Sequence, residues 1–146
     1  KIEPQFEVES SKFLESVSGL EIAALELKKL FLALETEKNK FQKSDKNFPI
    51  IYNKSDRKCT VQYGEFSIMF YSQIEKSNLL MDLPLYFELQ KHESSSNILN
   101  ILAVEEYHFE VKKVGEYGWI KDADNVLFIS SKKLAENSIN LLLSQT

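Results

Sequence analysis

Hydrophobic residues recur every three or four positions between residues 18 and 40, which is the period of an α-helix that buries one face. The residues of this stripe are Leu20, Ala23, Ala24, Leu27, Leu30, Phe31 and Leu34. Ser18 and Glu21 have the spacing of a capping box, so we expect the helix to begin at Ser18. Polar side chains after Lys38 compete for backbone hydrogen bonds, and we expect the helix to end near Lys40.

A second, thinner apolar row lies on the opposite side of the same helix. It consists of Ile22, Leu25 and Leu32, with Lys29 between them. A helix packed on one side only would leave these side chains in water, so we expect something to cover them. The cover is either the segment 1–17, which we favour, or a second copy of the chain in a twofold homodimer.

The segment 1–17 combines two patterns. Apolar and polar residues alternate over 1–9, which predicts an edge strand or an extended arm, because Pro4 cannot donate to a ladder. The apolar spacing over 10–17 predicts a short helical turn.

Residues 48–129 contain a series of short alternating or β-branched runs, which predict an antiparallel sheet of five to seven strands. Gly64 and Glu65 separate two of these runs and predict a tight hairpin turn. The segment 98–104 fits a buried strand better than a turn of helix. The segment 73–82 fits either a short helix or a loop.

Residues 131–145 repeat with a helical period again. Ser130 or Ser131 is placed to cap this helix. Its apolar face consists of Leu134, Ala135, Ile139 and Leu142. Because the strands cluster between two terminal helices, the sequence predicts one α+β domain over residues 1–146, with both helices on the same face of the sheet.

Composition and charge narrow the function classes. The chain has 146 residues, 43% of them hydrophobic, and a net charge of −4, which is typical of an acidic, soluble globular domain. A single cysteine permits neither an internal disulfide nor a multi-cysteine zinc site, so we expect a cytoplasmic protein. The first residue is Lys rather than Met, so we expect that something was removed from the N-terminus. The expected cytoplasmic location assumes that the removed part was not a targeting segment. No apolar run has the length of a membrane span, and we expect no membrane partner.

The charge is unevenly distributed along the chain. Seven basic and two acidic residues lie between Lys38 and Lys58, so the remainder of the chain is strongly acidic. This basic segment is either a docking patch for an acidic partner or, as we favour, a solvated loop.

One weak constellation is typical of an enzyme. Some metal-dependent nucleases place an acidic residue and a Glu-x-Lys motif on neighbouring strands, where the carboxylates hold Mg²⁺ and the lysine activates water. Asp82, Glu110 and Lys112 have these residue types. A glutamate and a lysine two residues apart are also typical of an exposed strand face, so a metal-dependent nuclease is the weaker hypothesis.

A second constellation could ligate a divalent metal. Glu106, His108 and Glu110 would project from one face of a strand, with His92 as a fourth ligand. The same residues form an ordinary polar row, and no partner is placed in the sequence to orient them. We therefore expect neither a metal nor any other cofactor.

Three aromatic residues are candidates for recognition of a partner. Tyr107, Tyr117 and Trp119 offer large rigid contact areas with a polar group, although strand aromatics are more often core residues. Their neighbours are mainly acidic, which excludes a nucleic-acid partner because such a surface repels phosphates. Cys59 alternates with apolar residues and is interpreted as a core residue.

These observations favour a non-catalytic protein-binding or accessory module, of an inhibitor-like, immunity-like or chaperone-like kind. Its partner would be another protein or a second copy of the chain. The candidate contact residues are Ile22, Leu25, Leu32, Tyr107, Tyr117 and Trp119. The alternatives are a small-molecule carrier that uses a cavity between helix and sheet, and the metal-dependent nuclease.

Overall fold

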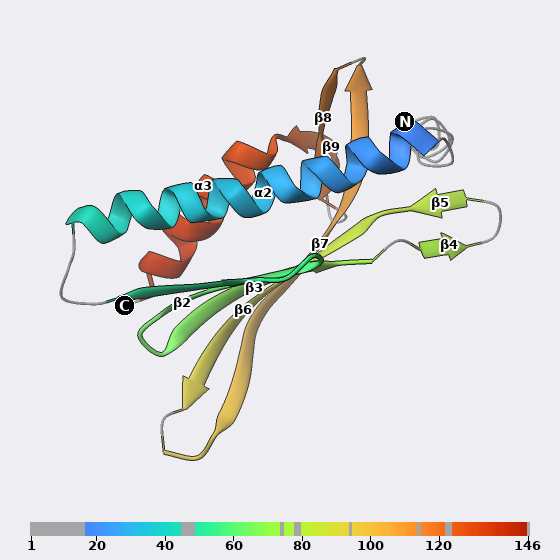
Figure 1. Ribbon diagram of the computed structural model, residues 1–146. Helices are drawn as coiled ribbons and strands as arrows, with labels where there is room; N and C mark the ends of the chain where they lie inside the picture. The colour runs from blue at the N-terminus through green and yellow to red at the C-terminus, as the bar shows by residue number, and fades with distance from the viewer. Residues whose placement is uncertain are drawn as a thin grey trace.

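Two helices and a curled antiparallel sheet make up the described chain (Figure 1). The computed structural model describes residues 17–44, 49–73, 75–77, 80–93, 95–113, 115–121 and 124–145. The helices are α2 (Val17–Ser44) and α3 (Ser131–Leu143). The strands are β1 (Ile50–Lys54), β2 (Lys58–Tyr63), β3 (Phe66–Ser72), β4 (Glu75–Ser77), β5 (Leu80–Asp82), β6 (Pro84–Glu93), β7 (Ile98–Lys113), β8 (Glu116–Lys121) and β9 (Asp124–Ile129).

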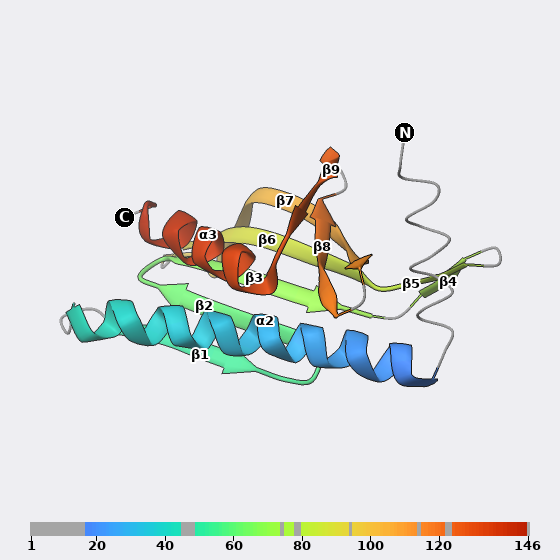
Figure 2. The same ribbon diagram turned by 90° about the horizontal axis from the view of Figure 1, so that it is seen from above.

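Seven strands form one sheet in the order β1-β2-β3-β6-β7-β8-β9, and every neighbouring pair is antiparallel. Figure 2 shows both helices on the same side of this sheet, with α2 alongside β1 and α3 above β3. The predicted α+β class is therefore confirmed, with the terminal helices on one face. Residues 1–16, where we expected an arm and a short helical turn, lie outside the described residues.

The buried face of α2 follows the predicted stripe with one correction. Its described core residues are at most 5% exposed; they are Ala23, Leu27, Leu30, Phe31 and Leu34. Ala24, which we placed in the stripe, is exposed, because it lies at the margin of the apolar arc. The side chain of Leu20 is not among those described.

The helix is longer than predicted at both ends. It begins at Val17, so Ser18 lies inside the first turn and is not the N-cap. It ends at Ser44, because Phe41 packs against the core and the Gln42 Oε1 atom accepts a hydrogen bond from the Ile50 amide at 2.6 Å. These tertiary contacts outweigh the weak helix preference of the polar residues after Lys38.

The helix α3 matches its predicted stripe and cap. Ser130 is the N-cap, and its side chain accepts a hydrogen bond from the Lys133 amide at 3.2 Å. The predicted apolar face is at most 2% exposed and consists of Leu134, Ala135, Ile139 and Leu142. This face packs on α2 and the sheet, so the two helices share one core.

The segment 73–82 is neither a helix nor a simple loop. It forms the two strands β4 and β5, which pair with each other from Glu75 opposite Asp82 to Ser77 opposite Leu80. β3 and β6 are antiparallel neighbours, so the segment that follows β3 and the segment that precedes β6 also run antiparallel and side by side. The two segments can therefore pair with each other as β4 and β5. The Ser72 hydroxyl donates to the Pro84 carbonyl where the two ladders meet.

We predict that Leu27→Ala lowers the free energy of unfolding by about 2–5 kcal/mol, because the truncated side chain leaves a cavity between α2 and the sheet. Leu32→Ala is the matched control, since it makes the same change in the same helix at a side chain that is 53% exposed. We expect that control to lose less than about 1 kcal/mol. Chemical denaturation measures both, and equal losses would contradict the described burial of α2.

Candidate functional site

The backbone brings two of the three nuclease-type residues together. The Phe109 amide donates to the Leu83 carbonyl at 3.2 Å, so in this antiparallel register the backbone of Asp82 lies beside that of Glu110. The Asp82 side chain is not among those described. Glu110 is buried, whereas Lys112 is exposed and its Nζ atom lies 5.4 Å from the centre of the Phe128 ring.

The four candidate metal ligands do not converge. The His108 Nε2 atom lies 3.1 Å from a Glu106 carboxylate oxygen. His92 lies eight positions from Pro84, the residue paired with His108, which is roughly 25 Å along the strand. Its Nε2 atom instead lies 3.0 Å from the Ser67 hydroxyl. Among the described residues, no group of three or more His, Cys, Asp or Glu side chains could hold a metal ion.

The three candidate recognition aromatics are mostly packing residues. Trp119 is 0% exposed, so it presents no contact area to a partner in this conformation. Tyr107 is buried and its hydroxyl donates to the Glu105 carboxylate at 2.7 Å; burial together with this carboxylate raises the pKa of Tyr107. Tyr117 is partly exposed and stacks on Phe109 with ring centres 6.1 Å apart. Trp119 and Tyr107 are thus core residues, which is the alternative that the sequence offered for these aromatics.

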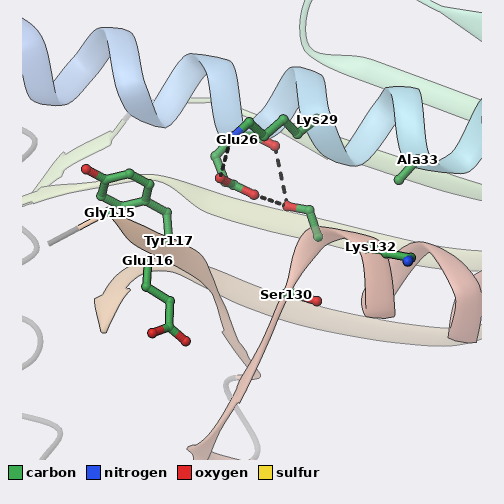
Figure 3. A pocket seen from close by; sticks show the side chains of 9 residues that line it. Glu26, Lys29, Ala33, Gly115, Glu116, Tyr117, Ser130 and Lys132 are labelled. Carbon is green, nitrogen blue, oxygen red and sulfur yellow. Dashed lines mark hydrogen bonds and ion pairs between the residues drawn. The ribbon is translucent and has the colours of Figure 1, made fainter. Parts of the chain in front are cut away.

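A buried polar chain links three elements of the core. The Trp119 Nε1 atom of β8 donates to the Ser131 hydroxyl of α3 at 3.0 Å. That hydroxyl donates to the Glu26 carboxylate of α2 at 2.5 Å. Figure 3 shows Glu26 pointing from its helix toward the first turn of α3. The carboxylate therefore lies near the positive end of the α3 dipole, where a negative charge is stabilised.

A shallow pocket of about 310 Å³ opens beside this chain. Its lining comes from α2, β8 and the start of α3, and includes Lys29, Glu116, Tyr117 and Lys132 (Figure 3). Several of these side chains are charged, whereas pockets for small ligands are lined mainly by apolar groups. The pocket is thus an open surface depression bordered by charged side chains rather than an enclosed cavity.

The most unusual surface is a projecting part of the hairpin formed by β6 and β7. We call residues 90–93 and 98–104 the apolar arm. Figure 1 shows that this end of the hairpin extends beyond both helices. Its large apolar side chains are between 45% and 64% exposed; they are Ile98, Leu99, Ile101, Leu102 and Val104. No charged residue interrupts residues 98–104.

A β-bulge concentrates four of these five side chains on one face, whereas Ile98 pairs with Glu93 and lies on the opposite face. Leu89 pairs with Ala103 but Gln90 pairs with Ile101, so Leu102 is an extra residue in β7. Two apolar residues therefore lie opposite Gln90, on the face turned away from the helices. Leu99 and Val104 lie on the same face, which we call the outer face, because their partners His92 and Glu88 alternate with the buried Leu89.

Local hydrogen bonds join the described residues near the tip of the hairpin. Asn97 adopts φ 55°, a left-handed conformation that asparagine tolerates in turns. The Glu93 carboxylate accepts from the Asn100 side chain at 3.0 Å and from the Ser96 hydroxyl at 3.3 Å. The exposure of the arm is consequently a property of a formed hairpin and not of an irregular loop.

Residues 98–104 form a strand, as predicted, but this strand is not buried. The strand β7 has 16 residues and is about 50 Å long, and the end that carries residues 98–104 extends beyond α2 and α3 (Figure 1). An apolar run without charges is typical of a buried strand, so the pattern alone could not reveal this exposure. The available signal was the polar turn at 93–97, which placed the run beside a loop tip.

The second apolar row of α2 is also exposed in the described chain. Leu25 is 54% and Leu32 is 53% exposed, and Ile22 is partly buried. Lys29 lies between them and its Nζ atom is 4.0 Å from the Glu26 carboxylate. This row lies on a different element from the apolar arm, so it is a separate surface.

Comparisons with known proteins give no relative for this chain. No family model, no curated protein and no solved structure matches it. No helix in the described ranges is long and apolar enough to cross a membrane. The function must therefore be argued from the surfaces themselves.

We predict that Ser131→Ala lowers the free energy of unfolding by about 2–4 kcal/mol, because it leaves the Glu26 carboxylate and the Trp119 N–H without their buried partner. Ser138→Ala is the matched control in the same helix. Its hydroxyl is equally buried but only donates to the Leu134 carbonyl of its own helix, so its loss should cost about 0.5 kcal/mol or less. Urea titrations measure both, and similar losses would contradict the role of the polar chain.

We predict that the fold loses stability at alkaline pH through Cys59. Burial raises the pKa of this thiol from 9.0 to about 11, so the folded chain holds a proton that the unfolded chain releases. The resulting stability is present below about pH 9 and is lost as the pH rises toward about 11, by roughly 2–3 kcal/mol. Denaturant titrations at about pH 8 and about pH 10.5 should show a smaller fall for Cys59→Ala than for the wild type. Equal falls would show that the thiol does not titrate in this way.

Proposed function

We propose that the chain is a non-catalytic protein-binding module and that its contact surface is the outer face of the apolar arm. The observation that carries this proposal is the exposure of four neighbouring apolar side chains on one face of a formed hairpin. Together they expose on the order of several hundred Å² of apolar surface, a size that marks interaction sites on soluble proteins. Leaving this surface in water costs free energy that a partner would recover.

The chemistry of the arm indicates the kind of partner. The centre is apolar and uncharged over residues 98–104, and acidic residues border it at Glu93, Glu105 and Glu106. This is the composition of a protein interface, with an apolar centre and a polar rim. The matching partner is a protein with an apolar patch bordered by basic or neutral groups, as an inhibitor-like, immunity-like or chaperone-like module would bind.

The alternative functions receive less support. A small-molecule carrier requires a cavity between helix and sheet, but side chains less than 2% exposed fill that space, among them Phe31, Phe70 and Phe87. The nuclease hypothesis rests on Asp82 and Glu110 alone, since Lys112 extends along the surface over Phe128. The one buried free cysteine suits a reducing compartment, and we place the module in the cytoplasm.

Site-specific photocrosslinking tests this function. A photoreactive phenylalanine analogue replaces Leu102 on the outer face, and in a matched control it replaces Leu127, which is 64% exposed but lies on β9. We expect an adduct at position 102 that is absent at position 127, when the chain is expressed in the cells that make it. The crosslinked protein is then identified and purified for titration.

Binding to the purified partner completes the test. We expect Leu99→Ser with Ile101→Ser to weaken binding at least about tenfold, because the outer face loses two apolar contacts. Leu127→Ser with Leu141→Ser makes two comparable changes at exposed positions off the arm and should leave the affinity unchanged. Identical adducts at both crosslinking positions, or equal affinities for both double variants, would refute the proposal.

A further inference from the structure

The apolar arm also exposes a backbone edge, which is distinct from its outer face. The strand β8 pairs with β7 only from Tyr107 onward. Residues 98–106 of β7 therefore pair with β6 on one side and, within the described chain, with no strand on the other. An open edge offers a row of backbone donors and acceptors to any strand that can lie beside it.

The register identifies the groups that this edge presents. The Phe109 amide points toward Leu83 on the β6 side of the ladder. Backbone direction alternates along a strand, so the amides of Glu106 and Val104 point to the open side. They are available for pairing without any loss of hydrogen bonds to β6.

This edge lacks two of the features that usually protect a sheet edge, proline and lysine, although it carries a third, the β-bulge at Leu102. Residues 98–106 contain neither proline nor lysine, and residues 98–104 contain no charge at all. The edge strand β1 at the other side of the sheet is different, because it has five residues, ends at Lys54 and is held to α2 by the Tyr52 hydroxyl on the Phe31 carbonyl. The edge at β1 is thus protected against pairing with another strand, whereas the edge at residues 98–106 of β7 is open to it.

From these observations we infer that two copies of the chain pair through their β7 edges, antiparallel about a twofold axis that passes through residues 98–104. An uncharged edge is self-complementary in this arrangement, because no like charges face each other across the axis. The pairing joins β6 and β7 of each copy into one four-stranded extension. Cross-strand contacts then cover part of the exposed apolar side chains of both arms.

This inference goes beyond the proposed function, because it concerns the backbone edge and a second copy, whereas the function concerns the outer face and another protein. The two are compatible, since edge pairing places the two outer faces side by side. The dimer would present a wider apolar surface than either copy alone. Each can fail without the other, because one test uses the purified chain and the other uses a separate partner.

Sedimentation velocity of the purified chain over a hundredfold range of concentration tests the inference. We expect a dimer for the wild type and a dissociation constant at least about tenfold higher for Val104→Pro, which removes the outward amide but keeps the bonds to β6. Val104→Thr keeps that amide and a β-branched shape, so it should remain a dimer. Ile101→Lys is a second variant. It places a positive charge near the axis in each copy, and the repulsion between these two charges should also dissociate the dimer.

Two further measurements separate this interface from others. Leu25→Glu with Leu32→Glu alters the exposed row of α2 and should leave the dimer intact. Amide hydrogen exchange at Val104 and Glu106 should be slow in the wild-type dimer and fast in Ile101→Lys, which we expect to be monomeric. A wild-type monomer throughout the range, or a dimer that the α2 variant dissociates and both edge variants preserve, would overturn the inference.

Discussion

The burial of the Glu26 carboxylate is the constraint on which the arrangement of the two helices depends. A carboxylate that is 6% exposed must keep its hydrogen bonds, because an unpaired buried charge is far more costly than a lost apolar contact. Its partner Ser131 stands at the first turn of α3 and also receives the Trp119 N–H. Apolar packing brings α2 and α3 together, and this polar chain fixes their relative position and their position on β8.

A second constraint is the difference in length between the sheet and its cover. The helices bury the inner faces of the strands near the middle of the sheet, where Phe70 and Phe87 are in contact with ring centres 5.0 Å apart. The strands β6 and β7 continue past this region (Figure 1). Apolar residues in the continuing part cannot reach the core, whatever their hydrophobicity. Apolar residues are therefore part of the core in one half of β7 and part of the exposed surface in the other half.

The sequence predicted the helices and the antiparallel class because these follow from local periodicity. The stripe around Leu30 and the face around Ile139 repeat regularly, and each is buried as its spacing indicates. The segment 98–104 shows where this reasoning stops. Leu99, Ile101, Leu102 and Val104 share a face only because of the bulge at Leu102, and their irregular spacing predicted a buried strand with a turn of helix as the weaker alternative. Burial of Trp119 and exposure of Val104 depend on which elements cover each strand, and single-residue patterns do not contain that information.

The apolar arm has a consequence for the internal motions of the molecule. Its ladder is held by β6–β7 pairing and, at residues 90–92, by bonds to β3 and Glu65, without helices above it, whereas the middle of the same strands is enclosed by the core. Opening of the arm therefore exposes little additional apolar surface, while opening of the middle requires the whole core to separate. One continuous strand thus belongs to two cooperative units with different opening free energies. A protease that needs an extended, unpaired backbone would reach the arm long before the rest of the fold opens.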